Sequence, residues 1–181
     1  MIYITRKRLK IGLVQCYFGR GKGKTTAALG QGFRAIGHGF KVYMVQFMKG
    51  DYRYGELESI KNTPNFEVKQ FGTPDLISEP RDIDYEQAKK ALEFAEEIIM
   101  SDEYDIVILD EIGVAIAYNL IDVEDVLKII NKKPEKVELI LTGGPNMHPK
   151  IKERADLLTE MRMIKHYYSS KSITARYGIE Y

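Results

Sequence analysis

A glycine-rich loop that ends in lysine and threonine constrains this chain more than any other sequence feature. The loop reads Gly-Arg-Gly-Lys-Gly-Lys-Thr-Thr over residues 19–26, between an apolar run at 11–16 and a helix-type run at 25–36. A strand, such a loop and then a helix form the arrangement of phosphate-loop nucleotide-binding proteins. The loop therefore predicts an α/β fold that holds the phosphates of ATP or GTP, whereas a glycine-rich turn without a ligand is the alternative.

The first half of this loop departs from the usual pattern G-x-x-x-x-G-K-(S/T). Gly23-Lys24-Thr25 supplies the second half, but Phe18 stands where the first glycine belongs. Glycines at 19, 21 and 23 let the backbone turn its N–H groups toward phosphate oxygens without a clashing side chain. Lys24 would add a positive charge beside the phosphates, and Thr25 a hydroxyl for Mg²⁺. The start of the following helix also favours an anion.

Two further basic residues in the loop leave a choice open. Lys22 and Arg20 could each contact phosphate or face solvent. The residues that we expect around the phosphates are Gly19, Arg20, Gly21, Lys22, Gly23, Lys24, Thr25 and Thr26.

A second apolar run, at residues 105–109, ends in two acids, Asp110 and Glu111. In a phosphate-loop fold we expect such a strand beside the loop strand, with its acid facing the metal. Mg²⁺ takes oxygen ligands and keeps several waters, so one or two carboxylates suffice. The alternative is that both acids cap the next helix. The pattern favours a metal site formed by Thr25, Asp110 and Glu111.

Strand-type and helix-type runs alternate along the whole chain. That alternation predicts a single-domain P-loop (RecA-like) α/β fold over residues 1–181, with a mainly parallel sheet and helices on both faces. Residues 72–83, with two prolines, are expected to form a long loop. We expect strands at 11–16, 41–47, 66–71, 105–109, 137–141 and 161–166, and helices at 25–36, 55–62, 84–101, 123–130 and 150–158.

Composition argues against several other classes of protein. With 44% hydrophobic and 29% charged residues, the chain can build a folded core. The net charge of +1 points to no nucleic-acid or membrane partner, and the apolar runs are too short to span a bilayer. A single cysteine, Cys16, fits a reducing compartment, so we expect a cytoplasmic protein. The three histidines show no metal-ligand spacing.

Beyond these physical arguments, the chain resembles the ATP:corrinoid (cob(I)alamin) adenosyltransferases of the phosphate-loop type nearly end to end. The family's loop G-N-G-K-G-K-T-T-A-A corresponds to residues 19–28, and its V-Q-F-x-K-G to residues 45–50. Its L-D-E corresponds to residues 109–111, and its closing G-I-(D/E)-Y to residues 178–181. These segments together make a specific combination.

The resemblance implies a reaction in which a Co(I) corrinoid attacks the 5′ carbon of ATP and triphosphate leaves. It implies that Lys24, Thr25 and Glu111 act in catalysis, with Glu111 as the direct metal ligand and Asp110 beside it. It also implies that Gln46 and Lys49 bind ATP. It further implies Mg²⁺ as cofactor, a reduced corrinoid as substrate, a homodimer, and a reductase as a source of electrons. The alternatives are another P-loop ATPase or nucleotide kinase, and a carrier that binds ATP and corrinoid without reacting.

Two departures from the family pattern affect the expected site. Members carry a Phe-Thr-Trp segment that helps to strip the lower cobalt ligand, whereas this chain has Gly-Thr-Pro-Asp-Leu at 72–76 and no tryptophan. We therefore expect a preference for corrinoids that are already reduced or lack a tightly held lower ligand, with Phe71 and Tyr85 beside the loop as core residues or corrinoid contacts. The family's T-G-R has become Thr-Gly-Gly, and the arginine missing at Gly144 has candidate replacements in Arg20, Arg154 and Lys49.

Overall fold

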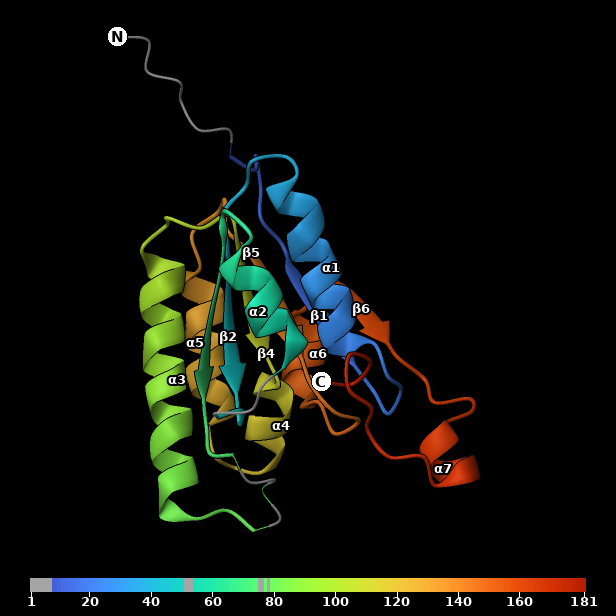
Figure 1. The fold of residues 1–181 in the computed structure, drawn as a ribbon. Coiled ribbons are helices and arrows are strands. Elements are labelled where there is room, and N and C mark those ends of the chain that lie inside the picture. The colour runs from blue at the N-terminus through green and yellow to red at the C-terminus, as the bar shows by residue number, and fades with distance from the viewer. Residues whose placement is uncertain (1–7, 51–53, 75–76, 78) are drawn as a thin grey trace, which may run out of the picture.

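A six-stranded, wholly parallel sheet forms the centre of the protein (Figure 1). The computed structural model describes residues 8–50, 54–74, 77 and 79–181, and the statements below concern these residues. The strand order is β3-β2-β4-β5-β1-β6. The strands are β1 (Val14–Phe18), β2 (Val42–Phe47), β3 (Phe66–Phe71), β4 (Ile106–Asp110), β5 (Glu138–Thr142) and β6 (Leu157–Glu160).

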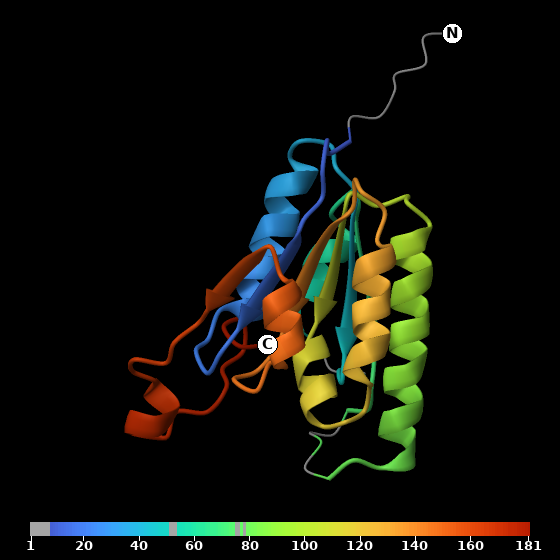
Figure 2. The same ribbon diagram turned by 180° about the vertical axis from the view of Figure 1, so that it is seen from behind.

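Helices cover both faces of this sheet, so the expected P-loop (RecA-like) α/β fold is confirmed. One face packs against α1 (Lys24–Ile36) and α2 (Gly55–Lys61). Figure 2 shows the opposite face, whose apolar cluster includes residues of α3 (Asp82–Met100), α4 (Ile112–Ala117), α5 (Val123–Lys132) and α6 (Pro149–Arg154). A short helix, α7 (Tyr167–Lys171), lies outside these layers.

Hydrophobic periodicity explains most of these elements. β2 and β4 are buried at every position, as expected for strands with helices on both sides. In α3 the buried side chains include Ala88, Ala91, Ala95 and Ile99, which repeat at three- and four-residue spacing. The predicted third strand has the observed bounds. The first helix begins at Lys24, one residue before its predicted start at Thr25. The first strand lies slightly later than predicted, at Val14–Phe18.

The last predicted strand, at 161–166, is wrong. The strand that closes the sheet is β6 at 157–160, and the helix predicted at 150–158 ends at Arg154. Pairing with β1 decides this: the Asp156 amide donates to the Val14 carbonyl at 2.8 Å, and the Met161 amide donates to the Phe18 carbonyl at 2.7 Å. Because β6 is an edge strand, Leu157 and Leu158 stay about half exposed and their apolar side chains resembled a helix face.

The expected neighbour of the loop strand also differs. β4, which ends in Asp110, pairs with β2 and β5 rather than with β1. β5 lies between β4 and β1, so any contact between Asp110 and the phosphate loop has to reach across the end of β5. In the described ranges, no helix combines the length and apolar character needed to cross a membrane.

Candidate nucleotide-binding site

The glycine-rich loop follows β1 at the carboxyl edge of the sheet and packs tightly against the chain that follows β6. Gly19 and Gly23 have φ angles of 119° and 118°, a region that favours glycine. A Cβ atom on Gly19 would lie 2.5 Å from the Met161 carbonyl oxygen. The Gly21 amide donates to that same oxygen at 2.7 Å. Backbone geometry and close packing therefore require these glycines.

A buried carboxylate cluster joins the loop helix to the sheet. Asp110, fully buried at the end of β4, accepts through Oδ1 from the Thr25 and Thr142 hydroxyls, each at 2.8 Å. Its Oδ2 accepts from the Lys49 ammonium at 2.8 Å and from the Gln46 amide at 3.3 Å. The Asp110 side chain thus connects residues from α1, β2, β5 and the turn after β2. We call these five residues the Asp110 cluster.

Thr142, at the end of β5, contacts both acids at the end of β4. Its hydroxyl donates to Asp110 and accepts from the Glu111 amide at 2.8 Å. It belongs to the Thr-Gly pair of the family resemblance, which gave it no role. β5 pairs directly with β4, which brings the Thr142 hydroxyl within reach of both acids, while the Thr25 hydroxyl reaches Asp110 directly.

Glu111 faces the same region from a left-handed backbone position, with φ at 63°. It occupies the N-cap position of α4, but its side chain makes no cap hydrogen bond, so the helix-cap interpretation fails for this residue. Burial and the neighbouring charge of Asp110 raise the pKa of Glu111, while Lys49 and Lys24 act in the opposite direction. A cation beside Glu111 would therefore stabilise its carboxylate.

Lys49 supplies the positive charge nearest to this pair of acids. Its ammonium lies 4.0 Å from Glu56 Oε1 and 4.6 Å from the centroid of the Tyr54 ring. Burial alone would lower the pKa of Lys49, but its hydrogen bond and ion pairs, chiefly with Asp110, raise it overall. Lys49 is therefore a fixed ammonium at neutral pH.

The loop cations take different directions. The Lys24 ammonium donates to the Gly21 carbonyl at 2.8 Å, so it stays over the loop. The Lys22 ammonium donates to the Ile179 carbonyl at 2.8 Å and lies 3.5 Å from Glu180 Oε1. The Lys22 side chain is also 42% exposed and lines the nucleotide pocket, so the choice between phosphate and solvent stays a prediction.

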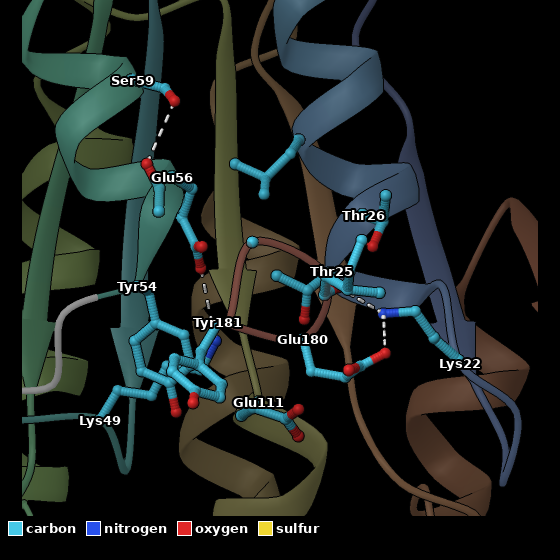
Figure 3. Close-up of a pocket in the computed structure, with 14 residues that line it drawn as sticks. Lys22, Thr25, Thr26, Lys49, Tyr54, Glu56, Ser59, Glu111, Glu180 and Tyr181 are labelled. Carbon is cyan, nitrogen blue, oxygen red and sulfur yellow. Dashed lines mark hydrogen bonds and ion pairs between the residues drawn. The ribbon is translucent and has the colours of Figure 1, made fainter. Parts of the chain in front are cut away.

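A pocket of about 580 Å³ lies between α1 and α2, within the size range of small-molecule sites (Figure 3). It brings together several sequence-predicted residues, namely Lys22, Thr25, Thr26, Lys49 and Glu111. Sequence reasoning missed most of the others as site residues. The additional lining residues are Leu29, Tyr54, Gly55, Glu56, Ser59, Gly178, Ile179, Glu180 and Tyr181.

The candidates to replace the arginine missing at Gly144 separate clearly. Arg20 is exposed and lines a different pocket, of about 390 Å³, together with Arg162. Arg154 donates to the Asn131 side chain at 2.9 Å, on the helices behind the sheet. Lys49 lines the pocket described above. Of these three cations, Lys49 lines the pocket next to Glu111, and its role in place of the missing arginine stays a prediction.

The loop after β3 begins beside this cation. The Lys49 amide donates to the Phe71 carbonyl at 3.2 Å. The Phe71 ring packs on Phe94 at 5.4 Å between centroids, as a core residue, while Tyr85 is 44% exposed. Asp75 and Leu76, in the segment that replaces Phe-Thr-Trp, lie outside the described residues. The expected corrinoid preference therefore stays a prediction.

Comparison with known proteins gives one consistent result. A family model described as ATP:corrinoid adenosyltransferase BtuR/CobO/CobP matches residues 10–181. A corrinoid adenosyltransferase of Escherichia coli K12 is 35% identical over 171 residues, which cover 94% of this chain and 86% of the relative. A corrinoid adenosyltransferase of a Sinorhizobium species is 39% identical over 175 residues, covering 94% and 80%.

Among solved structures, the flagellar accessory protein FlaH of Methanocaldococcus jannaschii has a similar fold. The TM-score is 0.57 at 17% identity, with 84% of this chain and 72% of FlaH covered. At that identity the likeness concerns the fold alone.

Proposed function

This chain belongs to the ATP:corrinoid adenosyltransferase family, and we propose that its pocket holds ATP while the 5′-deoxyadenosyl group passes to the Co(I) centre of a corrinoid. One observation carries the proposal most strongly. Thr25 of the phosphate loop is joined to a buried Asp110, and the same pocket receives Lys49 and Glu111. A triphosphate therefore meets a hydroxyl, an ammonium and a carboxylate that are already in place.

The chemistry that follows needs few groups from the protein. The cobalt lone pair forms the Co–C5′ bond, the C5′–O bond breaks, and its electron pair leaves on triphosphate. No proton has to move, so no general base or protein nucleophile is required. The side chains act by holding ATP in position and by stabilising the negative charge that gathers on the leaving group. Lys24, Lys49 and the loop amides supply that stabilisation in our proposal.

We also propose Mg²⁺ as the cofactor, because the oxygen donors at this site suit that ion. The Thr25 hydroxyl donates its proton to Asp110, which leaves its oxygen lone pairs for a ligand. Asp110 already accepts four hydrogen bonds, whereas Glu111 lines the pocket with a raised pKa. Thr25 and Glu111 would therefore hold the ion, with Asp110 orienting Thr25. When bound, the ion neutralises phosphate charge. Within the described residues, no group of three or more His, Cys, Asp or Glu side chains forms a metal-binding cluster, so phosphate and water would complete the shell.

The remaining expectations belong to this proposal as well. Family membership favours a cytoplasmic enzyme supplied with electrons by a reductase. A homodimer is favoured by apolar side chains exposed on the edge strand β6 and the chain after it. These are Leu157, Leu158, Met163 and Ile164, the last of them 95% exposed.

The decisive experiment identifies the products. The purified protein is incubated with ATP, Mg²⁺ and chemically reduced cobalamin, and the phosphate products and the corrinoid are analysed. We expect inorganic triphosphate and adenosylcobalamin in equal amounts. ADP as the product would support an ATPase or kinase instead, and binding of both substrates without turnover would support a carrier.

A further inference from the structure

A segment from the far end of the described chain forms one wall of the nucleotide pocket. Gly178, Ile179, Glu180 and Tyr181 line the same pocket as Thr25 and Thr26. Figure 3 shows Glu180 directed toward Lys22 of the loop, while Tyr181 lies toward Tyr54 and Lys49. The segment therefore extends from the phosphate loop toward the start of α2.

Lys22 attaches this segment to the phosphate loop. Its ammonium donates to the Ile179 carbonyl, 157 residues away along the chain, and lies 3.5 Å from Glu180 Oε1. Glu180 is itself fixed, because its carboxylate accepts from the Arg176 amide at 2.7 Å and from the Arg176 guanidinium at 3.3 Å. The Tyr167 hydroxyl also donates to it. The hydrogen bonds from Arg176 and Tyr167 lower the pKa of Glu180 to about 2, so this carboxylate stays charged.

The two ends of the pocket differ in chemistry. At the loop end stand the hydroxyls of Thr25 and Thr26 at the start of α1, where a helix N-terminus favours phosphate. At the other end stand the rings of Tyr54 and Tyr181. The Lys49 ammonium lies 4.6 Å from the centroid of the Tyr54 ring, so it stands at the boundary between the two ends. Glu56 and Ser59 of α2 line the pocket as well. An adenine ring has flat apolar faces that stack on aromatic side chains, and a ribose has hydroxyls that bond to polar ones. The second end therefore suits a nucleoside.

We propose that residues 178–181 form the nucleoside wall of the ATP site, with Tyr181 and Tyr54 contacting the adenine. Lys22 is then a positioning residue that sets this wall relative to the phosphate loop. The inference rests on the proposed use of ATP and extends it, because it assigns the part of ATP that is not phosphate to residues far from the loop in sequence. It concerns binding and can be tested without any corrinoid.

The test compares two ligands that share the phosphates. Dissociation constants for Mg·ATP and for Mg-inorganic triphosphate are measured for the wild type, Tyr181→Ala and Tyr168→Ala. Tyr168 is a matched control, since it is 63% exposed and does not line the pocket. We expect Tyr181→Ala to weaken ATP binding about tenfold or more, the scale of a lost base–aromatic stack. In Tyr181→Ala the dissociation constant for triphosphate should stay within about twofold of the wild type. Tyr168→Ala should change neither dissociation constant by more than about twofold, which is the scatter usual for surface substitutions.

A further variant tests the positioning role. Lys22→Ala should also weaken ATP more than triphosphate, and its effect should not add to that of Tyr181→Ala, because both changes release the same wall. Equal weakening for the two ligands in Tyr181→Ala would overturn the proposal, since the segment would then act through the phosphate loop. Unchanged or tighter ATP binding would overturn it as well and would identify the segment as a plug. Thermal unfolding of each variant checks that it is folded. A wild type that binds ATP but forms no adenosylcobalamin contradicts the proposed function alone.

Discussion

The two ends of the nucleotide pocket are built in different ways. At the phosphate end, Asp110, Gln46 and Thr142 are fully buried, and their hydrogen bonds join four parts of the fold. At the nucleoside end, residues 178–181 belong to no strand or helix, and Ile179 is 54% exposed. The first end is fixed by the sheet itself, whereas a few surface contacts position the second. Changes at the first end should therefore cost more stability and activity than changes at the second.

The largest effect should come from Asp110→Ala. It leaves the Lys49 ammonium, whose side chain is only 12% exposed, without its main partner. Breaking a buried ion pair in this way costs about 3–5 kcal/mol. We expect a loss of that size in the free energy of unfolding, measured by urea denaturation, together with the loss of transferase activity.

A double variant separates the two consequences. Asp110→Ala with Lys49→Met removes both charges, so much of the stability should return while activity stays absent. If the single variant were as stable as the wild type, the Asp110 cluster would not hold the phosphate end together, and the contrast between the two ends would fail.

The next effect concerns Lys24→Ala. Lys24 belongs to neither apolar cluster of the core, and its ammonium donates to the Gly21 carbonyl within the loop. Its loss removes one charge that stabilises the leaving triphosphate, which should lower turnover by about 10²–10³-fold. The melting temperature should stay near that of the wild type. Lys128→Ala serves as the control, because Lys128 lies on α5 with its side chain 66% exposed. Near-normal turnover in Lys24→Ala would contradict a catalytic role for the loop.

The same contrast explains what the sequence could predict. The glycine-rich turn after β1, the helix α1 and the strand β3 were predicted well because glycine spacing and apolar periodicity are local signals. Thr142 was missed as a site residue, since its role depends on β5 lying between β1 and β4. No local pattern encodes that strand order. The Asp110 and Glu111 pair could be found because two acids after a buried strand are visible in the sequence itself.

The chain beyond residue 155 was predicted poorly for a physical reason. Leu157 and Leu158 continued an apolar pattern from α6, but hydrogen bonds from Asp156 and Met161 to β1 determine where β6 begins and ends. The segment 178–181 has no periodicity, and a contact with Lys22 places it in the pocket. Its only sequence signal was the resemblance to the family ending. Tertiary contacts between distant residues therefore decided the parts that sequence reasoning missed.

A smaller effect is expected for Glu111→Gln, which keeps the side-chain shape and removes its charge. The amide is a weaker Mg²⁺ ligand, so the Mg²⁺ concentration for half-maximal activity should rise about tenfold or more, in line with the loss of a metal-binding contact. Isothermal titration of Mg²⁺ into the ATP-bound protein gives a second measurement. Glu58→Gln, an exposed change on α2, is the control. If Glu111→Gln had the Mg²⁺ titration of the wild type, Asp110 would become the candidate ligand.

The smallest effect should come from Glu180→Gln, at the nucleoside end. The pair between Glu180 and Lys22 lies near the surface, and such pairs contribute little. The Lys22 ammonium also keeps its bond to the Ile179 carbonyl. We therefore expect the dissociation constant for ATP to rise less than about fivefold, and less than in Lys22→Ala, which loses both contacts.

Salt and pH sharpen this last prediction. The difference in the ATP dissociation constant between wild type and Glu180→Gln should shrink as ionic strength rises, because salt screens the pair of Lys22 and Glu180 near the surface. Hydrogen bonds from Arg176 and Tyr167 hold the pKa of Glu180 at about 2, below its ordinary value. A lowered pKa means that the contact is fully present above the ordinary value and is lost only as pH falls through about 2. The difference should therefore be constant between about pH 5 and pH 8, since that range lies above the ordinary glutamate pKa. If Glu180→Gln weakened ATP binding as much as Lys22→Ala, charge rather than the backbone contact would hold the segment.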